Sequence, residues 1–235
     1  MKDLMRNAKG VLYIVATPIG NLEDITLHAI ATLSSVDVIL CEDTRQTMKL
    51  LGRYNVKTPL LSLNARSEKG RIAHVVRLLE SGKNAALVSD AGTPTISDPG
   101  SMLVSSVRTA LPEISVIAIP GASAVVAALS VSGLPSSEFL FLGFLPHKKG
   151  REKLFKEIAD AERTVVFYES PHRIMKTLGK LSEYLDADRR VVVARELTKA
   201  FEQVVFGSSA EVLEYFTVNK DKQRGEFVIV VGSSA

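Results

Sequence analysis

Short apolar runs rich in β-branched residues alternate with amphipathic segments along the first half of the chain. The runs are VLYIVAT, VDVILCED, PLLSLN, NAALVSD and ISVIAIP, which begin at residues 11, 36, 59, 84 and 114. Each is long enough for a strand and is followed by a helical pattern or a turn-rich loop. Strands that alternate with helices predict right-handed βαβ units and a mostly parallel sheet. Because the runs are apolar throughout, we expect both faces of this sheet to be covered.

A cluster of turn residues, SGLPSS at residues 132–137, interrupts the pattern. Beyond it the apolar runs are FLFLGFLP, TVVFYES, RRVVVARELT, EQVVFG and GEFVIVVG. The third and fourth of these follow one another without a helix between them, so the second sheet is predicted to be mixed. The sequence therefore predicts an α/β protein with an N-terminal α/β domain over residues 1–120 and a C-terminal α/β domain over residues 121–235.

Composition is that of an ordinary globular protein. Of the 235 residues, 46% are hydrophobic and 23% are charged, so the chain can bury a core of its own. The single cysteine, Cys41, excludes an internal disulfide and fits a reducing compartment. No apolar run approaches the roughly 18 residues that span a bilayer, and the first ten residues lack the apolar core of a signal peptide. We therefore expect a cytoplasmic protein with no membrane partner.

The charge of the chain permits a nucleic-acid partner without indicating one. The formal net charge is +3, and neither half is strongly basic, so any RNA contact is expected to use local patches. The segment HKKGREK at residues 147–153 is either a solvated loop or such a patch. No metal site is expected, because the chain has one cysteine and four histidines that lie far apart in the sequence: His28, His74, His147 and His172.

Three strand ends in the first half are rich in glycine and proline. They read ATPIGN, SDAGTPTISDPG and PGASA, and they begin at residues 16, 89 and 120. In open α/β sheets ligands bind at the carboxyl ends of strands, and glycine lets the backbone turn tightly or approach a ligand closely. The alternative is that these segments are ordinary turns. Of the two aspartates in the second segment, Asp90 is a candidate ligand group, whereas Asp98 is predicted to cap the helix after Pro99.

The same three loops disfavour a phosphate-bearing ligand. The fingerprint G-x-G-x-x-G does not follow the first strand, and no G-x-x-x-x-G-K-[ST] segment exists. The loops also contain few cations. An adenosine that carries an amino acid fits better than a nucleotide, because its amino and hydroxyl groups can bind backbone groups and a carboxylate. A serine hydrolase is not indicated, since no G-x-S-x-G segment is present.

Charged residues also follow two buried strands of the second half. FYESPHR places Glu169 and Arg173 after one strand, and VVVARELTKAFEQ places Arg195, Glu196 and Lys199 after another. Charges at the end of a buried strand favour a functional role, and the alternative is a salt bridge between arginine and glutamate.

Seven segments stand in the order found in one known family: LYIVATPIGNLEDITLHAI, CEDTRQTMKLL, LVSDAGTPTISDPG, PGASAVVAALSVSGLP, FLGFLP, FYESPHR and ARELTK. With these segments the chain resembles the bacterial small-subunit rRNA (cytidine-2′-O)-methyltransferases of the tetrapyrrole methylase superfamily, from about residue 11 to residue 232. The resemblance implies two α/β domains of the tetrapyrrole methylase type with S-adenosyl-L-methionine in the cleft between them. It also implies a homodimer.

The resemblance assigns cofactor contacts to the three glycine-rich loops and, beyond them, to two residues of the second domain. Carried over to this sequence, the cofactor-binding residues are Pro18, Asp90, Ala91, Gly92, Thr93, Ile96, Ser123, Ala124, Glu169 and Leu197. The partner that it implies is 16S rRNA within the 30S ribosomal subunit, methylated at the ribose of a decoding-centre cytidine, cytidine 1402.

The chain departs from the family pattern in two places. Members often carry a histidine after the third strand, where this sequence reads SLNARSE with Asn64 and Arg66, so the role of that histidine cannot be carried over. Members often continue beyond the last strand, whereas this sequence stops at Ala235. We expect the RNA contacts of that segment to be missing.

The reaction that the resemblance implies is in-line methyl transfer to a ribose hydroxyl, which needs orientation and a proton acceptor. Glu196 is a candidate acceptor, and so is Lys199 if burial depresses its pKa. Candidate phosphate contacts are Lys148, Lys149, Arg151, Arg173 and Arg195. Two alternatives stay open: a C-methyltransferase of tetrapyrrole precursors with the same fold, and a ribosome-binding factor without catalytic activity.

Overall fold

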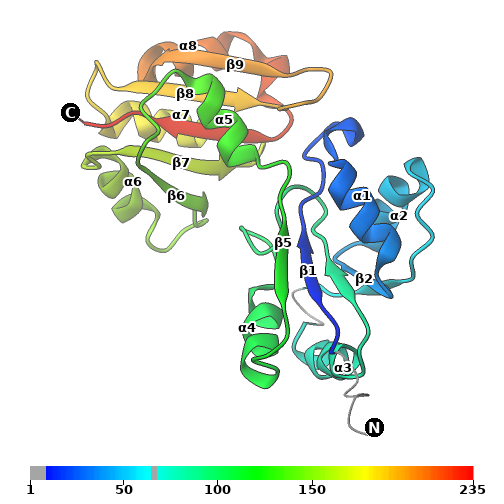
Figure 1. Cartoon of the computed structure of the whole chain (residues 1–235). Coiled ribbons are helices and arrows are strands. Elements are labelled where there is room, and N and C mark those ends of the chain that lie inside the picture. The colour runs from blue at the N-terminus through cyan, green and yellow to red at the C-terminus, as the bar shows by residue number, and fades with distance from the viewer. Residues whose placement is uncertain (1–8, 65–67, 235) are drawn as a thin grey trace, which may run out of the picture. The chain divides into compact units, whose positions relative to one another are not determined.

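The computed structural model describes residues 9–64 and 68–234, and these form two compact units that divide between Ser123 and Ala124 (Figure 1). The sequence places the domain boundary three residues earlier, between residues 120 and 121. The two units are called unit 1 and unit 2 below. No helix among the described residues is both long and apolar enough to cross a bilayer.

Unit 1 is built on a parallel sheet. Its strands are β1 (Leu12–Val15), β2 (Val38–Cys41), β3 (Leu60–Ser62), β4 (Ala85–Leu87) and β5 (Val116–Ile119). They are arranged in the order β3-β2-β4-β1-β5, and each neighbouring pair is parallel. Because β4 enters between β2 and β1, the carboxyl ends of β2, β4, β1 and β5 lie next to one another along one edge of the sheet.

Helices cover both faces of this sheet, as the continuous apolar strands predict. One face packs on α1 (Leu27–Ser35) and α2 (Thr44–Arg53), and the other packs on α3 (Glu68–Glu80) and α4 (Ser101–Ala110). A short 3₁₀ helix, η1 (Leu22–Asp24), precedes α1. Successive residues of a strand point to opposite faces of the sheet and so pack into the two hydrophobic cores in turn. In β4, for example, Ala85 and Leu87 face α3 and α4, whereas Ala86 faces α1 and α2.

Unit 2 is built on a mixed sheet. Its strands are β6 (Phe139–Phe144), β7 (Thr164–Glu169), β8 (Arg190–Arg195), β9 (Gln203–Ser208) and β10 (Phe227–Val231). Their order is β6-β7-β10-β8-β9, in which only β6 and β7 pair in parallel. The predicted α/β class, with a parallel first sheet and a mixed second sheet, is confirmed.

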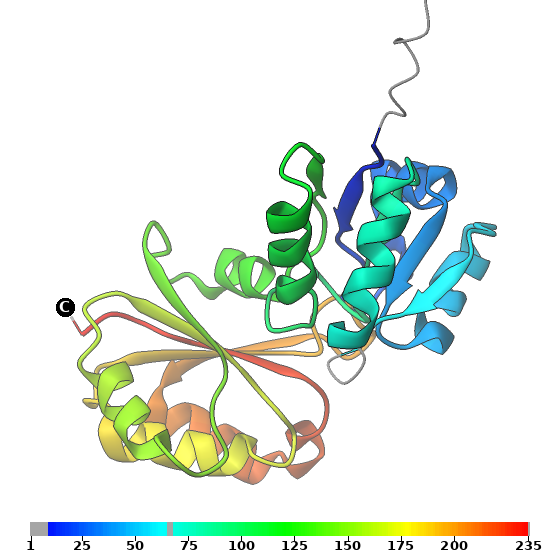
Figure 2. The same ribbon diagram turned by 90° about the horizontal axis from the view of Figure 1, so that it is seen from below.

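The helices of unit 2 are distributed unequally over the two faces of its sheet. Figure 2 shows α6 (Arg151–Ala159), α7 (Ile174–Tyr184) and α8 (Ser209–Val218) on one face and α5 (Ala124–Ser132) on the other. The three-helix face holds the main core, in which Phe155, Phe167 and Phe216 are fully buried. A 3₁₀ helix, η2 (Lys220–Gln223), leads into β10.

Candidate functional site

The three glycine-rich loops that the sequence singles out follow β1, β4 and β5, which are neighbours in the sheet of unit 1. The first two loops are joined by a short antiparallel bridge: the Thr17 N–H donates to the Gly92 carbonyl at 2.9 Å, and the Gly92 N–H donates to the Thr17 carbonyl at 3.1 Å. The Thr93 hydroxyl donates to the Ala122 carbonyl at 3.3 Å and so connects the third loop. The loops therefore form one structure, although they are far apart in sequence.

Two glycines in these loops stand where the backbones come close together. A Cβ atom at Gly121 would lie 2.9 Å from the Cβ of Ala16, nearer than real Cβ atoms approach. Gly92 has a φ of +80°, and a Cβ there would lie 3.3 Å from the Cγ2 of Ile19. Only glycine allows both the close backbone approach at residue 121 and the positive φ at residue 92 without strain. The two glycines therefore let the loops after β1, β4 and β5 pack this closely.

The loop after β4 also contains strained backbone. Thr95 has a φ of 74° and Ser97 a φ of 64°, a left-handed conformation that is unusual for residues other than glycine and an outlier for a β-branched one. Ile96 lies between them and is 48% exposed. Strained residues persist only where the surrounding structure fixes them, and they concentrate at ligand-binding sites. The strain therefore singles out this loop as the candidate site of unit 1.

Carboxyl groups gather beside the loop. The Asp43 N–H, at the end of β2, donates to Asp90 Oδ1 at 3.2 Å, which brings the β2 end against the β4 loop. Burial, and then the charges of Asp98 and Asp90, raise the pKa of Glu42 to about 7. Burial and the charge of Asp90 likewise raise the pKa of Asp98, against the effect of a hydrogen bond with Ser89. A cation bound here would reduce the repulsion among the carboxylates of Glu42, Asp90 and Asp98, whereas a phosphate would increase the negative charge.

Sequence reasoning missed Glu42 and assigned Asp98 wrongly. Nothing in CEDTR marks Glu42 as unusual, because its neighbours Asp90 and Asp98 come from a distant segment. Asp98 does not cap a helix: α4 begins at Ser101, its N-cap is Gly100 with a φ of 121°, and no side chain makes a capping hydrogen bond. Asp98 instead bonds with Ser89, at the start of its own loop.

The raised pKa of Glu42 predicts how stability depends on pH. The unfolded chain ionises this carboxyl near its ordinary pKa of 4.5, whereas the folded protein holds the proton up to about pH 7. The folded state binds more protons in that window, so this group's contribution to the free energy of unfolding falls as pH rises through it. Glu42→Gln removes the fall and should stabilise the protein at pH 8 by roughly 1–2 kcal/mol, after allowance for solvent screening. Urea unfolding of both proteins between pH 5 and pH 8 measures this, and parallel pH profiles would contradict it.

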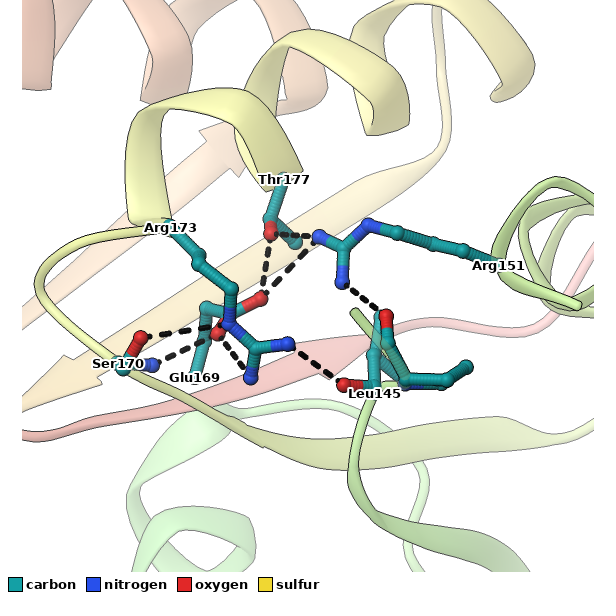
Figure 3. Close-up of polar contacts among 7 residues, drawn as sticks. Leu145, Arg151, Glu169, Ser170, Arg173 and Thr177 are labelled. Carbon is teal, nitrogen blue, oxygen red and sulfur yellow. Dashed lines mark hydrogen bonds and ion pairs between the residues drawn. The ribbon is translucent and has the colours of Figure 1, made fainter. Parts of the chain in front are cut away.

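In unit 2, the charged residues after β7 form a closed network around one buried carboxylate (Figure 3). Glu169 Oε1 accepts from the Ser170 N–H at 2.7 Å and pairs with Arg173 Nη2 at 2.8 Å. Glu169 Oε2 accepts from the Thr177 hydroxyl at 2.6 Å and from Arg151 Nη2 at 3.3 Å. The Glu169 side chain has no exposed surface, and those of Arg151 and Arg173 are 13% and 15% exposed.

This network limits what its members can bind. Arg173 also donates to the Leu145 carbonyl at 2.7 Å, and Arg151 to the Pro146 carbonyl at 3.0 Å, so both fasten the β6–α6 connection to β7. The predictions that Glu169 contacts a cofactor and that the two arginines hold phosphates stay predictions, and such contacts would compete with these bonds. Lys148 and Lys149, in the same connection, are exposed.

The turn between β8 and β9, residues 196–202, is the second cluster of charges in unit 2. Arg195 precedes it and is 7% exposed, with Nε donating to the Arg224 carbonyl at 2.6 Å and Nη1 to the Phe201 carbonyl at 3.2 Å. This guanidinium, a predicted phosphate contact, is thus engaged with the backbone. Leu197, in the turn, is 8% exposed.

The two candidate proton acceptors form an ion cluster in this turn. Lys199 Nζ lies 3.0 Å from Glu196 Oε1 and 2.7 Å from Glu226 Oε2. Burial alone would lower the pKa of Lys199, but hydrogen bonds to Glu226 and Glu196 outweigh it and raise that pKa. Partial burial would raise the pKa of Glu196, but bonds with the Glu226 N–H and with Lys199 outweigh it and lower that pKa. The raised pKa of Lys199 is opposite to the depression that a base requires, and the lowered pKa of Glu196 makes that carboxylate a weaker base than an ordinary glutamate. Both catalytic roles stay predictions.

The structure thus brings the predicted residues together in three places. The first place is the set of loops after β1, β4 and β5, which contain Pro18, Asp90, Ala91, Gly92, Thr93, Ile96 and Ser123. Pro18 is buried. Ala124 is the first residue of α5, in unit 2. The other two places are the Glu169 network and the β8–β9 turn. Asn64 follows β3, and Arg66 lies outside the described residues. The described residues contain no group of three or more side chains suited to a metal ion.

Comparison with known proteins identifies the family to which this arrangement belongs. A sequence profile of the family Tetrapyrrole (Corrin/Porphyrin) Methylases matches residues 11–213. The chain belongs to this family. Proteins named Ribosomal RNA small subunit methyltransferase I are among its relatives. The Thermotoga maritima protein is 47% identical over 94% of this chain and 98% of the relative, and the Bacillus subtilis protein is 46% identical over 96% and 76%. Within the tetrapyrrole methylases, the chain thus groups with rRNA methyltransferases.

Solved structures of tetrapyrrole methylases share the fold. The methyltransferase CobJ superposes with a TM-score of 0.69 at 21% identity, over 96% of this chain and 95% of that chain. A uroporphyrin-III C-methyltransferase from Thermus thermophilus, solved in complex with S-adenosylhomocysteine, superposes with a TM-score of 0.63 at 17% identity, over 95% and 97%. At these identities the likeness shows the fold alone.

Proposed function

We propose that the protein transfers a methyl group from S-adenosyl-L-methionine to the ribose 2′-hydroxyl of cytidine 1402 in 16S rRNA, within the 30S subunit. The observation that carries this proposal is the identity of 42–48% to proteins named for small-subunit rRNA methylation, over nearly the whole chain. The target atom and nucleotide come from the resemblance described above.

The loops of unit 1 suit this cofactor better than a nucleotide. When bound, S-adenosylmethionine supplies an electrophilic methyl group on a positively charged sulfur. Asp90 and Ala91, near the start of the loop after β4, are exposed, so a ligand can reach the carboxylate and the backbone. The carboxyl cluster of Glu42, Asp90 and Asp98 favours a cationic ligand, and the loops lack the cations of a phosphate site.

The chain's own contribution to the reaction is expected to be orientation. Holding a hydroxyl oxygen in line with the bond that breaks can supply several kcal/mol of the barrier reduction. The ion cluster of the β8–β9 turn offers Lys199 as a fixed cation rather than as a base. In this role it would bind an RNA oxygen. We also propose that the protein acts in the cytoplasm, where its substrate is found.

We further propose that the protein is a homodimer, as the resemblance implies. The edge strand β6 exposes Phe139, Leu140 and Phe144 by 41%, 43% and 56%, and an exposed apolar edge suits a second copy of the chain. Sedimentation velocity should show one species of twice the chain mass. A monomer at micromolar concentration would contradict this part of the proposal.

One assay separates the proposed activity from its two rivals. Methyl-labelled S-adenosylmethionine is incubated with the protein and either 30S subunits that lack the modification or a tetrapyrrole precursor such as uroporphyrinogen III. We expect label in 16S rRNA alone. Label in the tetrapyrrole would favour a C-methyltransferase, and binding to 30S subunits without any label would favour a non-catalytic factor.

A further inference from the structure

Phe201 is the most exposed aromatic side chain of the described residues. It is 73% exposed and lies in the β8–β9 turn, between the exposed residues Ala200 and Glu202. Exposed apolar residues are common on protein surfaces, so exposure alone carries no functional meaning. The turn that carries this ring, however, contains strained backbone that several hydrogen bonds hold in place.

The backbone of the turn is strained and held from several sides. Glu196 has a φ of 51° and Thr198 a φ of 64°, both left-handed, although neither is glycine. The Lys199 N–H donates to the Glu196 carbonyl and the Glu202 N–H to the Lys199 carbonyl, each at 3.0 Å. Such strain persists only where neighbouring structure fixes it, and here it lies in the backbone of the turn that carries Phe201.

The segment before β10 supplies the support for this turn. The Glu226 N–H donates to Glu196 Oε1 at 2.9 Å, and the Glu196 N–H donates to the Glu226 carbonyl at 2.9 Å. Gly225 has a φ of +102°, and a Cβ there would lie 2.6 Å from the Cγ of Glu196, so the close approach needs glycine. Arg195 holds the Phe201 carbonyl directly, at 3.2 Å. The backbone is thus anchored immediately beneath a ring that touches solvent.

Charges of both signs lie in this turn and in the segment that supports it. Lys199 is paired with Glu196 and Glu226, and Lys222 is paired with Asp221. The exposed cations of the supporting segment are Lys220 and Arg224. An exposed aromatic ring with exposed cations in the neighbouring segment is a combination with which proteins bind unstacked nucleotides, since the ring stacks on a base and the cations meet phosphates. Val204 and Phe206, on the strand β9 that follows the turn, are also exposed, by 37% and 55%, so a second copy of the chain is the alternative occupant that the test below must separate from RNA.

We propose that Phe201 stacks on an unstacked nucleobase of the rRNA substrate, and that the β8–β9 turn is preorganised to present it. The inference rests on the proposed function and deepens it, because it names a residue that holds the RNA. Preorganisation matters because a turn whose backbone is already fixed loses little freedom when the base arrives.

The first test is the variant Phe201→Ala, measured for binding to 30S subunits that lack the modification. Loss of one base–aromatic stack is expected to weaken that binding roughly 5- to 100-fold. Thermal stability and affinity for S-adenosylmethionine should stay at the wild-type values, because the ring is exposed. Phe206→Ala is the matched control: Phe206 is 55% exposed on β9, and its removal should leave 30S binding unchanged.

A second variant reports the stack itself. The chain has no tryptophan, so Phe201→Trp creates a single fluorescent reporter that can still stack. Its emission should be quenched when 30S subunits are added, and methyl transfer should continue. Wild-type 30S affinity in Phe201→Ala, or a Trp signal that responds to protein concentration and not to RNA, would overturn the inference. The second result would indicate another copy of the chain as the occupant. Failure of the wild-type protein to label 16S rRNA would instead refute the proposed function.

Discussion

Glu169→Gln is expected to destabilise unit 2 by about 3–5 kcal/mol, the typical result of breaking a buried ion pair by removing one partner. The carboxylate accepts bonds from Ser170 and Thr177 and pairs with Arg151 and Arg173. Glutamine keeps the shape but not the charge, so two nearly buried guanidinium groups would remain without a counter-charge. Urea unfolding measures the change, which should fall on the transition of unit 2, since two units need not unfold together.

Glu183→Gln is the matched control for this prediction. Glu183 pairs with Lys180 at 2.8 Å but is 61% exposed, and its loss should cost less than about 1 kcal/mol. Affinity for S-adenosylmethionine is measured in parallel. If Glu169→Gln stays folded at low temperature and keeps the wild-type affinity, the carboxylate is a structural group. An unfolding free energy within about 1 kcal/mol of wild type would contradict the role assigned to the network.

Asp90→Asn is expected to weaken S-adenosylmethionine binding roughly 10- to 100-fold, because hydrogen bonds to a charged group contribute about 1.5–3 kcal/mol. Asp90 is exposed on the β4 loop, so the exchange should leave the free energy of unfolding almost unchanged. Titration calorimetry measures the affinity.

The control for this variant lies at the opposite end of the same sheet, where the parallel strands begin. Asp37, just before β2, is also exposed and accepts a hydrogen bond from the Asn84 N–H at 2.7 Å. Asp37→Asn should bind S-adenosylmethionine as the wild type does. Equal affinities for Asp90→Asn and the wild type would remove Asp90 from the cofactor site and weaken the assignment of the β4 loop.

The fold could be predicted from the sequence because its signals are local. The ten strands of the described residues all correspond to apolar runs, and the mixed second sheet follows from two consecutive strands with no helix between them. The three glycine-rich loops were found for the same reason, since their composition reflects the backbone of each loop.

What the sequence could not predict depends on contacts between distant segments. The pKa of Glu42 is raised first by burial and then by the charges of Asp98 and Asp90, which reach it only because β4 enters the sheet beside β2. The pKa of Lys199 is raised rather than lowered because Lys199 bonds with Glu226, which is 27 residues away in the sequence, as well as with Glu196. From the sequence, Arg151 and Arg173 are expected to be available for phosphates. In the structure, both pair with Glu169 at the end of β7. In each case burial and partners decide the chemistry of a side chain whose identity gives only its charge.

The position of the transferred methyl group tests the central claim most directly. Unmodified 30S subunits are incubated with the protein and methyl-labelled S-adenosylmethionine, and the 16S rRNA is digested and analysed by mass spectrometry. We expect one labelled 2′-O-methylcytidine, in the fragment that contains cytidine 1402. A methyl group on a base, label at another nucleotide, or unlabelled rRNA under conditions in which the protein binds the cofactor would contradict the account.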